Sequence, residues 1–394
     1  MKTAIIGGGA AGFFLAVNLK EMAPSMDVTI MERSQRVLQK VLISGGGRCN
    51  CTNTFQGVRD LSAVYPRGHR LLKRLFKVFD HDDAYRWFEH HGVELIVQPD
   101  DCVFPRAQDA RVVADCLLDN ARQRGVDVRT GVSVDSLADL SDYDFIVITT
   151  GGQPQEKGLQ WIEGHEIETP VPSLFTLSID DERLRGLMGT VVDPATVSLP
   201  GTKLRAEGPL LLTHWGVSGP AVLRLSSYAA RHLHDCNYRA PLSINWAHAA
   251  EDEVRTMLET VSRRESSKWL NSVKPYGFSS RLWDYLAVKT LGQRAHSPWG
   301  SLNRKELNRL VNTLCNDTYQ VSGRAPFKDE FVTCGGISLK NVNPATLESR
   351  HRQHLYFAGE VLDIDGVTGG FNFQAAWTTA YVVAQSIAQS VVAV

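Results

Sequence analysis

The chain has 394 residues, of which 43% are hydrophobic, and its formal net charge at pH 7 is −1. This length can bury a large core in two or three domains, and the balanced charge argues against a nucleic-acid or membrane-surface role. No apolar stretch approaches the roughly eighteen residues of a membrane span, so no membrane partner is expected. Seven scattered cysteines without a Cys-x-x-Cys pair favour a reducing compartment and disfavour a disulfide framework, a metal site or a dithiol reductase.

The first predicted element is a strand, turn and helix around a glycine motif. Gly7, Gly9 and Gly12 follow a short apolar run and occupy the G-x-G-x-x-G positions. In this motif the first glycine permits a sharp turn, the second lets backbone N–H groups approach a pyrophosphate, and the third lets the helix pack closely. A second apolar run ends at Glu32, whose carboxylate can accept hydrogen bonds from an adenosine ribose. The segment therefore predicts a dinucleotide-binding unit.

A secretory signal is the alternative for this N-terminus, because Lys2 precedes an apolar stretch. Such a signal needs neither glycines between a strand and a helix nor an acid after a second strand. No obvious small-residue cleavage site follows the stretch. We therefore expect a cytoplasmic protein.

The next informative segment contains three consecutive glycines, Gly45 to Gly47, bounded by Ser44 and Arg48. Glycines allow successive N–H groups to converge on an anion, and an arginine can neutralise a phosphate. We expect a loop that faces the ligand, and a flexible surface turn is the alternative. Lys40 could point at the cofactor or at water, and Cys49 is either a reactive thiol or a small buried filler.

Residues 71–91 carry apolar side chains at helical spacing and predict a pair of scaffold helices. Residues 126–129 and 132–134 predict a hairpin. The apolar run 144–149 predicts a buried strand that ends in Thr150-Gly151-Gly152. In flavoproteins of the two-dinucleotide type, the returning strand places such a turn against the dinucleotide.

After about residue 170 the pattern changes to short strand-like runs separated by turn residues, which predict an antiparallel sheet or small barrel. Helical patterns follow over 251–261, 280–291 and 304–315, which indicate a helical insertion. The chain is then expected to return to the first domain near residues 333–336.

The C-terminal segment predicts the other half of the cofactor site. A strand over 355–358 delivers Gly359 and Glu360, and Gly369-Gly370 precedes a helix expected from Asn372 to about Ala388. A helix N-terminus directed at a flavin would stabilise negative charge on the reduced ring. An ordinary helix that packs on the sheet is the alternative.

The chain resembles the YhiN/BaiN-like flavoproteins, which include enzymes described as aminoacetone oxidases and as NAD(P)/FAD-dependent oxidoreductases. The likeness covers nearly the whole chain, and its most specific element is the Ser-Gly-Gly-Gly-Arg-Cys-Asn string that starts at Ser44. It implies an FAD domain made from both chain ends and interrupted by a β-barrel with a helical insert. Where Tyr-Asn is common in the family, this chain has Phe371-Asn372, which removes a phenolic hydroxyl.

We therefore expect an α/β fold with a Rossmann-like FAD domain of the two-dinucleotide type over 1–185 and 333–394. The interrupting β-barrel-like domain is expected over 186–332, with its helical subdomain at about 250–320. The residues expected to bind FAD are Gly7, Gly9, Ala10, Ala11, Gly12, Glu32, Arg33, Lys40, Ser44, Gly45, Gly46, Arg48, Cys49, Asn50, Asn53, Val134, Thr150, Gly151, Gly152, Gly359, Glu360, Asp363, Gly369, Gly370, Phe371 and Asn372.

The expected activity is that of an FAD-dependent oxidoreductase acting on a small molecule. No second G-x-G-x-x-G occurs between Gly152 and Gly335, so NAD(P)H would dock transiently as the donor, or an amine would supply the electrons. His214 is the candidate for proton exchange with the substrate, and a structural histidine is the simpler interpretation. Two alternatives remain: a non-catalytic redox sensor, and a tRNA-modifying flavoenzyme, which the balanced charge disfavours.

Overall fold

The computed structural model describes residues 1–153, 155–325 and 332–392, and the chain divides into two compact units. Unit 1 comprises Met1–Pro172 and Phe327–Val394, and unit 2 comprises Ser173–Pro326. Both ends of the chain therefore contribute to unit 1. Within the described residues, no helix is long and apolar enough to cross a membrane.

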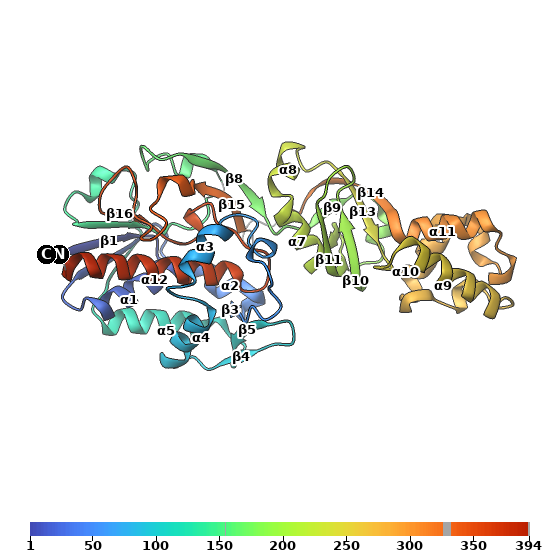
Figure 1. Cartoon of the computed structure of the whole chain (residues 1–394), viewed down its shortest axis with the longest axis horizontal. Helices are drawn as coiled ribbons and strands as arrows, with labels where there is room; N and C mark the ends of the chain where they lie inside the picture. Colours follow the sequence, from blue (N-terminus) through green and yellow to red (C-terminus); the bar gives the residue numbers. More distant parts are fainter. Residues whose placement is uncertain (154, 326–331, 393–394) are drawn as a thin grey trace. The chain divides into compact units, whose positions relative to one another are not determined.

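Unit 1 is built on a parallel five-stranded sheet in the order β16-β7-β1-β2-β6. The central strands β7 and β1 are buried apart from Lys2 at the start of β1, as expected for a parallel sheet covered by helices. Helices α1 and α12 pack against each other along the sheet (Figure 1). The elements of this core are β1 (Lys2–Ile6), α1 (Ala10–Met22), β2 (Asp27–Glu32), α5 (Ala110–Gln123), β6 (Asp127–Thr130), β7 (Phe145–Ile148), β16 (Leu355–Phe357) and α12 (Phe371–Val392).

Smaller elements complete unit 1. Strands β3, β5 and β4 form an antiparallel sheet, and β8 pairs with β15. The helix pair expected over 71–91 is confirmed as α3 and α4. The bounds are α2 (Gln39–Gly47), β3 (Thr52–Asn53), η1 (Leu61–Ala63), α3 (His69–Leu75), α4 (His81–His90), β4 (Leu95–Val97), β5 (Cys102–Pro105), η2 (Leu137–Leu140), η3 (Glu156–Gly158), β8 (Ile167–Ser173), β15 (Val332–Ile337), η8 (Leu339–Asn341) and η9 (Gly359–Val361).

The hairpin expected over 126–134 is wrong. Residues 127–130 form β6, which pairs in parallel with β2, and residues 132–134 form no strand. The physical reason is that Thr130 lies beside Glu32 at the edge of the sheet, and the chain then turns across the carboxyl end of β2 instead of folding back. Residues 132–134 thereby become part of a pocket wall.

Unit 2 is a closed barrel in the order β10-β11-β12-β9-β14-β13, with antiparallel neighbours. The expected barrel and helical insertion are confirmed. Strand β9 belongs to this barrel, so unit 2 begins at Ser173 and not at the expected residue 186. The barrel elements are β9 (Leu177–Ile179), α6 (Glu182–Arg185), β10 (Val191–Ser198), β11 (Arg205–Leu212), β12 (Gly216–Ser218), α7 (Pro220–Tyr228), α8 (Ala230–Asp235), β13 (Pro241–Asn245) and β14 (Asp317–Arg324).

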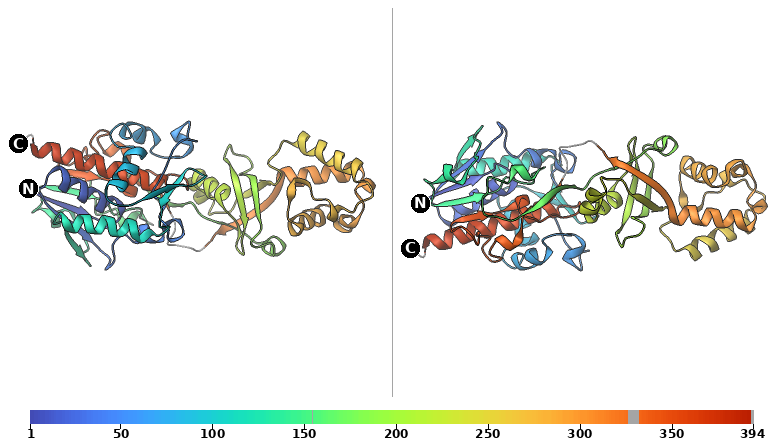
Figure 2. Two further views of the ribbon diagram at one scale, coloured as in Figure 1. Left: turned by 90° about the horizontal axis from the view of Figure 1, so that it is seen from below. Right: turned by 90° about the horizontal axis from the view of Figure 1, so that it is seen from above.

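The helical insert connects β13 to β14, and its helices gather into one cluster (residues 251–316, yellow to orange in Figure 2). Apolar residues of α9, α10 and α11, such as Leu258, Leu286 and Leu310, are buried between the helices. The elements are α9 (Glu251–Arg264), η4 (Leu270–Ser272), η5 (Pro275–Gly277), α10 (Ser280–Leu291), η6 (Gly292–His296), η7 (Trp299–Ser301) and α11 (Arg304–Asn316).

Candidate flavin-binding site

The three glycines of the N-terminal motif meet three different surroundings. Gly7 has φ +117°, and a Cβ there would lie 2.5 Å from the carbonyl oxygen of Thr149. A Cβ on Gly12 would lie 2.1 Å from the carbonyl oxygen of Gly7, so the turn and α1 pack too closely for any side chain. A Cβ on Gly9 would meet no described atom within 4 Å. The open space therefore lies at Gly9, beside Ala10 and Ala11 at the N-terminus of α1, where an anion is favoured.

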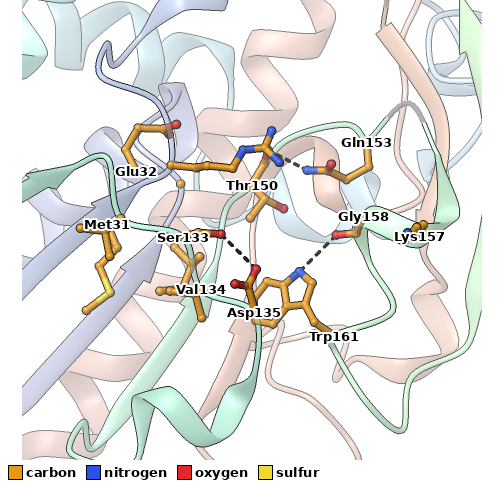
Figure 3. Close-up of a pocket in the computed structure, with 14 residues that line it drawn as sticks. Met31, Glu32, Ser133, Val134, Asp135, Thr150, Gln153, Lys157, Gly158 and Trp161 are labelled. Atoms are coloured by element: carbon orange, nitrogen blue, oxygen red, sulfur yellow. Dashed lines mark hydrogen bonds between the residues drawn. The ribbon is translucent and has the colours of Figure 1, made fainter.

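A pocket of about 260 Å³ lies at the carboxyl ends of β1 and β2 (Figure 3). Residues 132–135 lie on one side of it, and Gln153, Lys157, Gly158 and Trp161 lie on another. Thr150 lines the pocket, and its Oγ1 is buried without a hydrogen-bond partner among the described residues. The lining residues are Ile6, Gly7, Met31, Glu32, Arg33, Val132, Ser133, Val134, Asp135, Thr150, Gln153, Lys157, Gly158 and Trp161.

Glu32 is held in place by groups from both sides of the turn. Its Oε2 accepts a hydrogen bond from the Gly8 N–H at 2.8 Å. Its Oε1 accepts from the Ser34 N–H at 2.8 Å and from the Ser34 hydroxyl at 2.7 Å. An ionised carboxylate oxygen has about two acceptor positions, so Oε2 can still accept from a ligand hydroxyl. This geometry suits the expected contact with a ribose.

Glu360 joins three segments of unit 1. Its Oε2 accepts from the Lys40 ammonium at 2.6 Å and from the Gly152 N–H at 3.2 Å, and its Oε1 accepts from the Thr333 N–H at 2.8 Å. Burial opposes ionisation, but the Lys40 charge and the hydrogen bonds outweigh it, so the pKa of Glu360 lies below its ordinary value. Lys40 thus points at Glu360, a contact that the sequence did not predict, and its contact with the cofactor remains a prediction.

We expect Glu360→Gln to change how stability depends on pH. A lowered pKa means that the stabilisation is present above the unfolded-state pKa of about 4.3 and is lost as the pH falls through the lower folded-state pKa. In urea unfolding, the free energy of unfolding of wild type should therefore exceed that of Glu360→Gln by the largest amount at pH 7. This difference should become smaller as the pH falls. Glu94→Gln, at a side chain that is 77% exposed, is the control and should show little gap at any pH. A Glu360→Gln gap that is the same at every pH would contradict the assignment.

The glycine-rich segment after Lys40 is a short helix followed by a left-handed turn. Gly45, Gly46 and Gly47 have φ values of +57°, +68° and +80°. A Cβ on Gly46 would meet no described atom within 4 Å. Ser44 donates to the Val41 carbonyl at 2.9 Å. The Arg48 guanidinium lies 4.4 Å from the centre of the Phe104 ring. The expected phosphate contact of Arg48 therefore remains a prediction.

Residues 50–53 attach this turn to the start of α12. The Asn50 side chain, oriented to satisfy its hydrogen bonds, donates to the Thr52 carbonyl at 2.9 Å and accepts from the Gly370 N–H at 3.1 Å. Asn53 donates to the Gly369 carbonyl at 3.1 Å. A Cβ on Gly370 would lie 2.2 Å from the Thr52 carbonyl oxygen, so this approach requires glycine. The N-terminal and C-terminal halves of the expected site thus contact each other directly.

Cys49 and Cys51 are both fully buried, with their sulfur atoms 3.9 Å apart. The hydrogen bond to Cys49 and burial raise the pKa of the Cys51 thiol well above its ordinary value. A buried thiol with a raised pKa is a poor nucleophile, which applies to Cys51. For Cys49 it is the complete burial of the side chain that favours the filler interpretation. No group of three or more metal-ligating side chains occurs in the described ranges.

The remaining C-terminal candidates make contacts within unit 1. Gly359 has φ +78°, and its Cβ would lie 2.8 Å from the Cβ of Ala11. The Asp363 N–H donates to the Ile337 carbonyl at 3.0 Å. Asn372 bonds both backbone groups of Gly366, at 2.8 and 2.9 Å. The Phe371 carbonyl accepts a hydrogen bond from the Tyr65 hydroxyl at 2.8 Å. Tyr65 lies in the segment before α3, so its phenol group lies close to position 371.

His214 is the one candidate that lies in unit 2. It is exposed in the turn between β11 and β12, with its ring centre 5.0 Å from that of Trp215. The other candidates lie in unit 1. The chemical role of His214 therefore remains a prediction.

Several pocket residues were not predicted: Ser133, Asp135, Gln153, Lys157, Gly158 and Trp161. They belong to connecting segments without a motif, and only the path of the chain across the sheet brings them to the pocket. The strand-like pattern over 132–134 was the one available signal, and it was assigned to a hairpin.

The parallel sheet, the glycine turn against α1 and the fixed acid at the end of β2 define a Rossmann-like dinucleotide-binding protein. The solved 3-ketosteroid delta1-dehydrogenase from Sterolibacterium denitrificans shares this fold, with a TM-score of 0.51 at 10% identity over 98% of this chain and 99% of that one. The chain belongs to the HI0933-like family, whose Rossmann-domain model matches residues 1–386. The resemblance stated from the sequence is thus confirmed.

Two relatives match over nearly their full length. The 3-dehydro-bile acid delta(4,6)-reductase of Clostridium scindens is 26% identical over 98% of both chains. The ribosomal RNA dihydrouridine synthase of Escherichia coli strain K12 is 28% identical over 97% of both chains. These matches confirm the expected class, an FAD-dependent oxidoreductase.

Proposed function

We propose that this chain reduces a carbon–carbon double bond conjugated to a carbonyl group, with NAD(P)H as a transient electron donor. The observation that carries this proposal is the full-length similarity to two reductive enzymes with very different substrates. A 3-oxo bile acid with double bonds at positions 4 and 6 and a uracil ring both contain a double bond conjugated to a carbonyl. The reaction type is therefore better supported than any one substrate.

The residues of unit 1 fit FAD as the cofactor that this reaction needs. The open space at Gly9 admits a pyrophosphate, Glu32 can accept from the ribose, and the unpartnered Thr150 hydroxyl offers a polar contact. Val134 and Met31 provide apolar lining beside them. When bound, FAD supplies hydride transfer between the donor and the substrate carbon.

The chain's own contribution is positioning and charge. Helix α12 begins directly after Gly370, and its N-terminus favours nearby negative charge. Asn50, Asn53 and Tyr65 hold the backbone before and at the start of this helix. We propose that these residues fix the helix end that stabilises the reduced cofactor, and that His214 exchanges a proton with the substrate.

The oxidative half-reaction tests the proposal. FAD-loaded protein is reduced photochemically without excess reductant, and a cyclic conjugated enone or an isolated alkene is added without oxygen. We expect the enone alone to restore the oxidised flavin spectrum and to gain two hydrogens. His214→Gln should keep its FAD and reoxidise more slowly. If neither an enone nor a uridine-containing RNA reoxidises the flavin, the proposed reaction is wrong, and a redox sensor becomes the better account.

A further inference from the structure

We propose that one end of the helical insert is a contact surface for RNA. This basic tip comprises the end of α9, the loop after it and the first turn of α11, with the side chains of Arg263, Arg264, Lys268, Trp269, Arg304 and Lys305. The inference rests on the proposed function, because it names the class of molecule that carries the reducible base.

The charge of the chain is unevenly distributed. The whole chain has 42 Lys and Arg against 43 Asp and Glu. The insert, residues 251–316, contains 11 Lys and Arg against 7 Asp and Glu. The balanced charge of the whole chain therefore conceals a basic segment, and it does not disfavour a nucleic-acid partner for this part of unit 2.

Backbone hydrogen bonds bring the parts of the basic tip together. The Trp299 N–H donates to the Lys268 carbonyl at 2.9 Å, and the Gly300 N–H donates to the Ser266 carbonyl at 2.9 Å. The loop that follows α9 is therefore fastened to the segment that leads directly into α11. Helices α9 and α11 also pack against each other. Their basic ends consequently lie at the same end of the insert.

The cations of the basic tip differ in how they are engaged. Lys268 pairs with Glu265 at 2.7 Å, and the Arg263 guanidinium donates to the Glu259 carbonyl at 3.2 Å. Arg264, Arg304 and Lys305 are exposed and form no ion pair with another described residue. Three unneutralised cations in one place favour a polyanion.

Trp269 is the aromatic element of the basic tip. Its side chain is 52% exposed, which is unusual for so large an apolar group, and it directly follows Lys268. Aromatic side chains interleaved with cations bind single-stranded nucleic acids, because bases stack on the ring while phosphates contact the cations. An anionic membrane surface would also attract this combination. RNA is favoured because uracil contains the bond type of the proposed reaction.

Binding of a labelled oligouridine to the full-length, FAD-loaded protein tests the inference. The probe has about 30 nucleotides, longer than the roughly 4–16 that a single-strand-binding domain covers. By fluorescence anisotropy, we expect Trp269→Ala to raise Kd about tenfold, in line with the loss of one stacked base. The double variant Arg264→Glu/Lys305→Glu should also weaken binding and should lower the slope of log K against log salt by about 1.4, or about 0.7 per lost phosphate contact.

The matched control changes the same charges elsewhere in unit 2. The control variant is Lys203→Glu/Arg205→Glu: Lys203 lies in the turn of the β10–β11 hairpin, Arg205 is the first residue of β11, and both are exposed. Strand β10 runs antiparallel to β13, and its last residue, Ser198, pairs with Ser243. The hairpin that follows Ser198 therefore lies toward the start of β13, whereas the insert leaves the barrel from the other end of β13, after Asn245. This control should bind oligouridine like wild type.

The proposed RNA surface would be wrong if the tip variants bound oligouridine like wild type, or if the hairpin control lost as much oligouridine affinity as they did. It would also be wrong if the tip variants lost binding to phosphatidylserine vesicles while their oligouridine affinity was unchanged. Reduction of the small enone separates this inference from the proposed function. Enone reduction without oligouridine binding rejects only the tip. Tip-dependent binding with no reduction of any conjugated substrate supports the tip and rejects the proposed reaction.

Discussion

We expect the replacement of Gly9 by valine to yield a folded protein that has lost its FAD. A valine side chain at this position enters the open space beside the N-terminus of α1, where the pyrophosphate is expected. The backbone at Gly9 has φ −92° and ψ −167°, an extended conformation that valine adopts readily. The fold should therefore survive while the cofactor is excluded. Flavin absorbance of the purified protein and circular dichroism measure the two effects separately.

Gly12→Val is the contrasting variant. Its Cβ would overlap the Gly7 carbonyl oxygen at 2.1 Å, so we expect misfolding or a large loss of stability. Loss of FAD in Gly12→Val would therefore not identify the binding site, whereas loss in a well-folded Gly9→Val would. A Gly9→Val protein that purifies yellow with full flavin content refutes the placement of the pyrophosphate.

Replacing Asp365 by leucine should destabilise unit 1 by about 3–5 kcal/mol, as expected when one partner of a buried ion pair is removed. The Asp365 side chain is fully buried, and that of Arg67 is only 13% exposed. The Arg67 Nε lies 2.5 Å from Asp365 Oδ1, and a second contact joins Nη2 to Oδ2. Burial disfavours the charged guanidinium, but Asp365 outweighs it and raises the pKa of Arg67. Without Asp365, that charge would remain buried and would lose the carboxylate that contacts both its Nε and its Nη2.

The double variant Arg67→Met/Asp365→Leu separates the ion pair from simple packing. Replacing both partners by apolar groups is often close to neutral, so the double variant should recover most of the lost free energy of unfolding. Urea unfolding of the two variants and wild type gives the comparison. A cost below about 1 kcal/mol for Asp365→Leu, the value typical of an exposed pair, would show that the pair is not effectively buried.

The sequence predicted those parts of the site that depend on local backbone requirements. Gly7 and Gly12 are needed for a turn and a close approach, and Glu32 follows at the end of a short strand. Such backbone requirements can be recognised in a few consecutive residues. Contacts between distant parts of the chain cannot be recognised in this way, since Lys40 and Glu360 are 320 positions apart and Arg67 and Asp365 are 298 apart.

The misplaced hairpin and the missed pocket residues have one common cause. Residues 126–134 alternate like two strands, but only the pairing of β6 with β2 decides that the second run crosses the sheet end. Trp161 and Gln153 reach the pocket through the same long-range arrangement. The net charge of the whole chain was misleading in a similar way, because its near-neutral value concealed the basic tip.

Anaerobic mixing of the purified, FAD-loaded protein with NADH or NADPH tests whether the chain passes electrons from a nicotinamide to a conjugated substrate. We expect rapid loss of the oxidised flavin absorbance with at least one nicotinamide, followed by its return when a conjugated enone or a uridine-containing RNA is added. Bleaching by a small amine but by neither nicotinamide would contradict the account, because it would make the protein an oxidase.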